Sequence, residues 1–167
     1  MIQPTILVMG NVVADVVARP IDEVPHTGSV HPETVAFYPG GCAGNVAIGL
    51  ARLGVTPRLV ACVGQDAFGA ALLEAWQQHG VDTSLMARLP SEATGVTIVL
   101  VDSVGERRFI STPGANNRLT PAALPAEAMN GAFALHIAGF FAALGLEDGT
   151  LAARLAEAQA HGLLTSL

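Results

Sequence analysis

The chain has 167 residues, of which 51% are hydrophobic and 13% are charged, and its mean hydropathy is +0.49. A chain of this size and composition can bury a sizeable core, so we predict a single globular domain. The net charge is −6, with eight arginines and no lysine, which excludes the basic patch that nucleic acids and anionic membranes require. No apolar run approaches the length of a membrane span, and residues 1–4 do not resemble a secretion signal. We therefore predict a cytoplasmic protein that binds neither nucleic acid nor a membrane.

The first predicted strand is the short apolar run at residues 6–10, which ends in glycine and suits a strand buried on both faces of a parallel sheet. A β-branched stretch follows at residues 11–18, with one carboxylate, Asp15, in its middle. That carboxylate either caps a turn or faces solvent on an edge strand, or it binds substrate hydroxyls at the end of the first strand. These residues alone favour neither interpretation.

The rest of the chain is organised around a glycine-rich segment at residues 40–54, which follows an extended stretch at residues 30–38. A glycine run lets the backbone approach a ligand, and the helix after it points free N–H groups at the same place. Asn45 is the side chain at the mouth of this loop that can both donate and accept hydrogen bonds. We therefore predict a small-molecule site of the kind that holds an anion, followed by a buried helix that stops at Gly54.

The two cysteines lie in this loop and in the next apolar run, at Cys42 and Cys62. Their spacing is not typical of a zinc site. We expect both to be buried free thiols, as in a cytosolic protein.

A second inner strand is predicted at residues 58–64, and a helix follows from Asp66 to Gly80 with Asp66 as its N-cap. The inward face of this helix has helical spacing and comprises Phe68, Leu72, Ala75, Trp76 and His79. The order of strand, glycine loop, helix and strand also suggests a dinucleotide-binding oxidoreductase, in which Asp66 would bind the ribose of NAD. Residues 40–44 do not fit G-x-G-x-x-G, however, and a capping role explains Asp66 better.

Residues 94–112 break the α/β order, because two extended runs flank a turn at residues 102–106, as is typical of a β-hairpin. An antiparallel hairpin does not fit a parallel sheet. We therefore assign it, with strands near residues 12–19 and 30–38, to a small second sheet that we expect to cover the site as a lid.

The last third of the chain returns to the α/β order, with a third inner strand at residues 133–139, a helix at residues 148–161 and a fourth strand at residues 163–167. Phe140 and Phe141 follow the third strand. Ligands of open α/β sheets bind beyond the carboxyl ends of strands, so these rings either wall a pocket or pack in the core.

Together these segments resemble the ribokinase-like (PfkB) carbohydrate kinase family over essentially the whole chain. The family's first signature has paired glycines, an asparagine, a small residue two places on and two further glycines at fixed intervals. The matching residues are Gly41, Asn45, Ala47, Gly54 and Gly64. The segments 64–69 and 114–116 and the hairpin add to the likeness.

The resemblance implies a Rossmann-like parallel sheet flanked by helices, with a β-sheet lid, and phosphorylation of a hydroxymethyl group of a sugar or nucleoside using ATP and Mg²⁺. It also favours the substrate-binding interpretation of Asp15, and it makes the glycine loop a substrate loop beside the lid hinge rather than a phosphate cradle. A homodimer through the lid is a further family-level expectation. The substrate-binding residues implied by position are Asn11, Asp15, Gly40, Gly41, Asn45 and Phe140.

Two departures from the family bear on the substrate. Ribokinases proper have an asparagine two residues before the substrate aspartate, where this chain has Val13, and a glutamate after the third inner strand, where it has Gly139 and Phe140. These differences argue against ribose itself. Apolar rings at that place resemble adenosine kinases and some other sugar kinases, and they suit a flatter or less hydroxylated substrate.

The family's second signature, Asp-Thr-x-Gly-Ala-Gly-Asp, supplies the catalytic base and the anion hole and has no counterpart in this sequence. We therefore expect residues 1–167 to be the N-terminal part of the family fold, without a catalytic residue, and to be inactive alone. The alternatives are a non-catalytic truncated kinase that binds ligand or dimerises, and the NAD-binding oxidoreductase.

Overall fold

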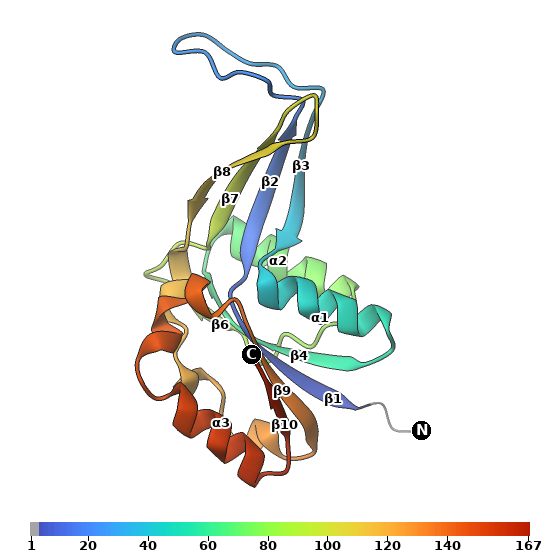
Figure 1. Cartoon of the computed structure of the whole chain (residues 1–167), viewed down its shortest axis with the longest axis vertical. Coiled ribbons are helices and arrows are strands. Elements are labelled where there is room, and N and C mark those ends of the chain that lie inside the picture. Colours follow the sequence, from blue (N-terminus) through green and yellow to red (C-terminus); the bar gives the residue numbers. More distant parts are fainter. Residues whose placement is uncertain (1–3) are drawn as a thin grey trace.

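The computed structural model describes residues 4–167 and contains a main parallel sheet with a second sheet rising from its upper edge (Figure 1). The main sheet has the order β10-β9-β1-β4, and every neighbouring pair in it is parallel. Its strands are β1 (Thr5–Gly10), β4 (Thr56–Val60), β9 (Ala132–Ala138) and β10 (Leu164–Ser166). All four strands that we expected in the main sheet are therefore present.

The main sheet is covered on both faces, as the continuous apolar run of β1 predicts. Leu7 and Met9 belong to one core cluster, which includes residues of α3 (Leu151–Ala160), whereas Val8 belongs to a second cluster with residues of the other helices. Those helices are α1 (Cys42–Arg52) and α2 (Ala67–Gln78). Burial of each such apolar side chain contributes about 1.5–3 kcal/mol to the free energy of folding. The three-layer body is thus the part of the chain that hydrophobic burial stabilises most.

The second sheet has the order β3-β2-β7-β8, in which β2 and β7 are parallel and the outer pairs are antiparallel. Figure 1 shows β2 continuing upward from the end of β1, so that a single extended segment serves both sheets. The strand expected at residues 30–38 lies at residues 34–40, because the stretch before it is irregular and the strand runs on into the glycine loop. The strands are β2 (Val13–Arg19), β3 (Thr34–Gly40), β7 (Val96–Val101) and β8 (Arg107–Thr112).

The strand predicted at residues 58–64 is interrupted at Ala61. Its second half, β5 (Cys62–Gly64), leaves the main sheet and pairs in parallel with β6 (Ala87–Leu89). Between β8 and α3 the backbone forms short 3₁₀ turns. These are η1 (Gly114–Arg118), η2 (Pro121–Ala123), η3 (Ala126–Met129), η4 (Phe140–Ala142) and η5 (Leu144–Glu147).

The start of α2 confirms the predicted cap, because Asp66 Oδ1 accepts the Gly69 N–H at 2.8 Å. Trp76 is fully buried as predicted. It packs against Gly44 of α1, where a Cβ would lie 2.9 Å from the indole ring. The placement of Phe68 in the core was wrong, since its side chain is 41% exposed.

The two cysteines differ, so the prediction of two buried thiols was wrong for one of them. Cys62 is buried, and burial raises the pKa of its thiol to about 11. Cys42 is exposed, because at the first position of α1 it lines a surface cavity and does not enter the core. Across residues 4–167, no helix combines the length and the apolar character that a bilayer crossing requires.

Candidate functional site

One face of the second sheet carries a row of polar side chains that crosses all four strands. Asp15 of β2 pairs with Tyr38 of β3 on one side and with Thr97 of β7 on the other, and Thr97 pairs with Ser111 of β8. Partners in a β-ladder project to the same face, so the register aligns the four side chains. Ser111 Oγ and Thr97 Oγ1 are 3.0 Å apart and hydrogen-bonded. A carboxylate flanked by hydroxyl groups is a surface that binds polyhydroxylated ligands.

Asp15, at the centre of this row, is half-buried, and desolvation raises the pKa of its carboxyl group. Among the hydrogen bonds and ion pairs of residues 4–167, none involves its side chain. A partly desolvated carboxylate without donors gains free energy from any hydroxyl group that reaches it. Asp15 is therefore a ready acceptor of hydrogen bonds from a ligand.

Gly40, at the end of β3, lies directly against this carboxylate. A Cβ at Gly40 would come within 2.1 Å of Asp15 Oδ2, so any side chain there would displace the carboxylate. The next residue, Gly41, has φ +88° and lies against the backbone of Asn11 and Val12, where a Cβ would approach to 2.6 Å. The paired glycines are thus explained by contact with the first strand and with Asp15.

Asn11, between β1 and β2, holds the start of α1. Its Oδ1 accepts the Cys42 N–H and its backbone oxygen accepts the Ala43 N–H, each at 3.1 Å. Two of the N–H groups that would have held an anion are therefore occupied by Asn11 itself. Our inference of an anion cradle from the glycine loop is not supported by this geometry. The Nδ2 group of Asn11 has no partner among the described residues, and Asn11 lines the crevice below the polar row.

Two adjacent cavities lie in the crevice between the sheets. The first, of about 250 Å³, lies under the polar row and is lined by Asn11, Val13, Thr97 and Ser111 with others, and it extends to Ala142. The second, of about 460 Å³, also reaches Ala142 and has a mostly apolar lining. That lining includes Cys42, Ile137, Gly139, Phe140 and Phe141. The first compartment carries hydroxyl and amide groups, the second is the more apolar of the two, and they meet at Ala142.

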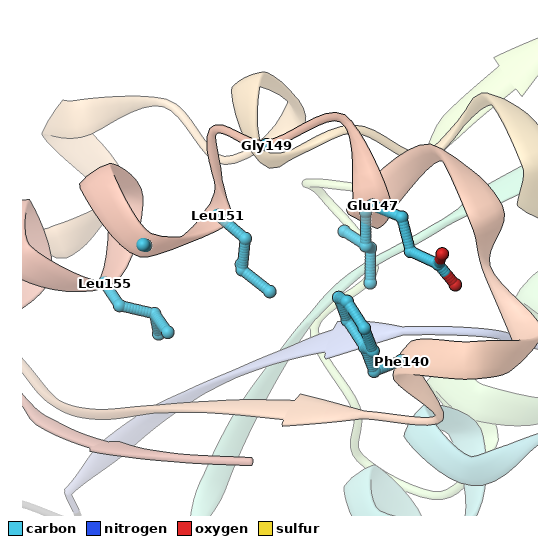
Figure 2. Close-up of a pocket in the computed structure, with 7 residues that line it drawn as sticks. Phe140, Glu147, Gly149, Leu151 and Leu155 are labelled. Atoms are coloured by element: carbon cyan, nitrogen blue, oxygen red, sulfur yellow. The ribbon is translucent and has the colours of Figure 1, made fainter.

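Phe140 follows β9, where Gly139 has φ +69° and packs against Asn11 Oδ1. Its ring contacts Phe141 edge-on, with centroids 5.2 Å apart. Phe140 also borders a separate cavity of about 370 Å³ beside α3, where Figure 2 shows Phe140 and Leu151 turned toward each other. That cavity is lined by apolar side chains apart from Glu147. Phe140 therefore lies between the crevice and the α3 side of the body.

Two of the six predicted site residues, Asn11 and Phe140, line the crevice cavities, whereas Asp15, Gly40, Gly41 and Asn45 do not. Asn45 lines a separate groove of about 280 Å³ beside α1, with Tyr38, Arg52 and His79 among its neighbours. Tyr38 is the edge residue of the polar row, so the groove borders that row. The structure thus places Asp15, Gly40, Gly41 and Asn11 together, with Phe140 across the crevice and Asn45 at its side.

The hydroxyl side chains of the row, Tyr38, Thr97 and Ser111, were not among the predicted site residues. The signal that could have found two of them is the hairpin turn at residues 102–106, which sets Thr97 opposite Ser111. The partner of Asp15 on β7 could not be found in this way, because β2 and β7 lie about eighty residues apart in the sequence.

Asp66, the residue on which the NAD interpretation depended, is fully engaged. Besides capping α2, it accepts the N–H of Thr94 at 2.8 Å and the hydroxyl of Thr94 at 2.7 Å. Burial alone would raise the pKa of Asp66, but these hydrogen bonds outweigh that effect and lower it. Its oxygens are not free for a ribose, so the dinucleotide interpretation is not favoured.

Comparison with known proteins identifies the family. The family model for pfkB family carbohydrate kinase matches residues 3–165. A ribokinase from Schizosaccharomyces pombe is 32% identical over 124 residues, and the match covers 70% of this chain and 39% of that protein. A ribokinase from Lactococcus lactis is 35% identical over 120 residues with the same coverage. The matched stretch thus covers well under half of the length of these relatives.

Solved structures agree with the sequence matches. A fructokinase from Xylella fastidiosa superimposes with a TM-score of 0.77 at 26% identity, over 98% of this chain and 51% of that chain. A structure of that fructokinase with bound ATP gives a TM-score of 0.76 at 25% identity. The architecture described above is therefore that of about half of a sugar kinase.

Proposed function

The chain belongs to the pfkB family of carbohydrate kinases, and we propose that it forms the acceptor-binding part of an enzyme that phosphorylates a hydroxymethyl group of a sugar or nucleoside with ATP. In this proposal residues 1–167 are the N-terminal part of a ribokinase-like domain, and the second sheet is its lid. The observation that carries the proposal is the unpartnered carboxylate of Asp15, which lies in a row of hydroxyl side chains and against Gly40.

The residues of this chain bind and orient the acceptor. Asp15 accepts hydrogen bonds from two acceptor hydroxyls, and its partial burial strengthens them because less water competes. Thr97, Ser111 and the Nδ2 group of Asn11 supply donors and acceptors beside it. Coverage by the second sheet excludes water and holds the reacting hydroxyl in one geometry, which is the main contribution of protein to phosphoryl transfer.

ATP would supply the transferred phosphoryl group, and Mg²⁺ would neutralise its charge. Among residues 4–167 there is no cluster of three His, Cys, Asp or Glu side chains that could hold a metal ion by itself, and Mg²⁺ at such sites is held largely by the substrate phosphates. The N–H groups of Cys42 and Ala43 at the start of α1 are already held by Asn11. We therefore assign no step of the transfer to this chain, and we expect it to bind acceptor without phosphorylating it.

The aromatic side of the crevice favours an acceptor with a flat, weakly polar part. Phe141 is 86% exposed beside the apolar compartment, whereas the polar row lies on the other side of Ala142. A ring that stacks on an exposed phenylalanine gains about 0.5–1.5 kcal/mol beyond its buried area. A nucleoside would use both compartments, whereas free ribose would use one.

The opposite face of the second sheet supports a homodimer through the lid. Its central row is apolar across all four strands and consists of Phe37, Val16, Ile98 and Ile110. Ile110 is 62% exposed, and an exposed apolar sheet face is typical of an interaction surface. Light scattering of the purified chain tests this dimer, and Ile110→Glu should convert it to a monomer.

A cytoplasmic location is consistent with the two free thiols.

Calorimetric titration with ribose, fructose and adenosine tests acceptor binding. We expect the Asp15→Asn variant to lose about tenfold or more in affinity, because one charged hydrogen-bond acceptor becomes neutral. The matched control is Glu33→Gln, which removes the same charge from an exposed residue. Equal affinity of wild type and Asp15→Asn would refute the role of Asp15. Measurable phosphorylation of any of these compounds by this chain with ATP and Mg²⁺ would refute the expected inactivity.

A further inference from the structure

The chain passes between the body and the second sheet four times, and all four connections meet at one junction. They are residues 11–12, residue 41, residues 90–95, and residue 113 with the first residues of η1. We propose that Asn116 is a positioning residue that binds the first and last of these connections together. It thereby sets the orientation of the second sheet relative to the body. The link to acceptor binding rests on the proposed role of Asp15, but the mechanical role does not.

Asn116 is fully buried, and its side chain forms three hydrogen bonds to backbone groups. Its Oδ1 accepts the Val12 N–H, and its Nδ2 donates to the oxygens of Val12 and Pro113, each at 2.8 Å. The two bonds to Val12 imitate the pair that a neighbouring strand would form. Both Nδ2 hydrogens are used within the protein, so Asn116 acts by holding the backbone and not by donating to a ligand.

Val12 depends on this side chain. It lies between the last residue pairs of β1 and the first of β2, where neither sheet supplies a partner for its backbone, and its side chain is fully buried. A buried N–H or C=O without a partner is costly. The side chain of Asn116 therefore fixes the backbone at the point where the chain leaves the main sheet for the second sheet.

The third connection is tied to β2 and to the fourth connection by hydrogen bonds between backbone groups. Ala14 N–H donates to Gly95 O, and Ala115 N–H donates to Ala93 O, each at 2.8 Å. A Cβ at Gly95 would lie 2.6 Å from Asn116 Nδ2, which shows how closely the third connection packs against this amide. Any rotation of the second sheet must change backbone angles in all four connections. Because Asn116 joins the first to the fourth, they can turn only together.

A distance measurement between two spin labels tests the proposal. The labels are placed at Val104, in the exposed hairpin turn of the second sheet, and at Leu53, exposed at the end of α1, in a Cys42→Ser background. Wild type should give one narrow distance distribution. Asn116→Ala, which removes all three bonds, should broaden and shift it. Asn116→Asp, which keeps only the bond from the Val12 N–H, should fall between the two.

The matched control is Asn117→Ala, because Asn117 is the exposed neighbour and its side chain forms no hydrogen bond among the described residues. Its distribution should equal that of wild type. Circular dichroism of each variant separates a loosened junction from an unfolded body. An unchanged distribution in folded Asn116→Ala would overturn the proposal.

A measurement on wild type keeps the proposal testable should the variants not fold. Among the described residues, the Val12 N–H donates to Asn116 alone, so its hydrogen exchange should be slower than that of an unprotected amide by about tenfold or more. Exchange at the rate of an unprotected amide would overturn the proposal. Neither measurement uses a ligand. If no acceptor binds, the proposed function fails, but the spin-label distances and the hydrogen exchange still decide the role of Asn116.

Discussion

The two four-stranded sheets contain similar apolar and β-branched residues but differ in what covers them. The last four residues of β1 in the main sheet are buried, with alternate side chains in two different cores, whereas all six residues of β8 in the second sheet are exposed. A surface that receives a ligand must stay open, so the candidate site lies on the sheet that burial stabilises least. Stability and proposed chemistry are thus divided between the sheets, and the junction at Asn116 connects them.

The largest expected effect is on stability, and it compares the same substitution, isoleucine to alanine, in the two sheets. Ile137→Ala in β9 should lower the free energy of unfolding by about 2–5 kcal/mol, because the side chain is 2% exposed and its loss leaves a cavity. In the monomer, at low protein concentration, Ile110→Ala in β8 should change it by less than about 0.5 kcal/mol, since that side chain is 62% exposed there. Urea denaturation measures both. Equal losses would contradict the comparison, and a concentration-dependent loss for Ile110→Ala would indicate that a second copy covers this face.

The next largest effect is on stability at Asp66, which joins the start of α2 to the connection that contains Thr94. Asp66→Ala should lower the free energy of unfolding by about 3 kcal/mol, because α2 loses its cap and the buried Thr94 N–H loses its partner. Asp66→Asn should cost less, since its oxygen can still cap the helix. Because the folded state lowers the pKa of Asp66, its contribution is present above the ordinary aspartate pKa and is lost as the pH falls through the lowered value. A wild-type stability that does not fall in acid relative to Asp66→Ala would contradict this assignment.

A third prediction separates binding from stability at the floor of the crevice. Gly40→Ala should weaken acceptor binding by about tenfold to a hundredfold, because the new methyl group displaces the Asp15 carboxylate. Gly49→Ala is the control, since a Cβ there meets no atom within 4 Å. That control should stabilise α1 by about 1 kcal/mol and leave affinity unchanged. Unaltered affinity in Gly40→Ala would show that Asp15 does not bind the acceptor from its present position.

The smallest effect is on stability at Asp15 itself. Burial raises the pKa of Asp15, so the folded state holds the proton more tightly than the unfolded state and the charged form is disfavoured at neutral pH. Asp15→Asn should therefore equal or slightly exceed wild type in stability at neutral pH, within about 0.5 kcal/mol. Its advantage should shrink as the pH falls through the raised pKa. A marked loss of stability at neutral pH would indicate a structural role for Asp15.

Local patterns predicted much of the fold. Continuous apolar runs identified the strands of the main sheet, and Asp66 and Gly54 marked a helix start and a helix end that the structure confirms. The hairpin predicted at residues 94–112 was assigned to a second sheet because antiparallel pairing does not fit a parallel sheet, and the structure places it there. These features depend on residues that are close in the sequence, and helix, strand and turn propensities also act between such neighbours.

Features that depend on distant residues were not predictable in this way. The break at Ala61 and the exposure of Cys42 depend on which segments pack beside them. The hydrogen bond by which Asn11 Oδ1 holds the start of α1 likewise joins residues that lie far apart in the sequence. The placement of Asn45 in a groove beside the polar row follows from the direction in which α1 leaves the glycine loop.

The sequence by itself determined that this is an α/β chain of the pfkB type, with Asp15 after the first strand and paired glycines before a buried helix, because each of these is a local pattern. The tertiary structure decided why they belong together. Register across four strands places Asp15 among hydroxyl groups, Gly40 leaves room for its carboxylate, and Asn116 joins connections about one hundred residues apart. Such relations arise only when distant segments pack against each other, because no local propensity encodes the partner of a side chain.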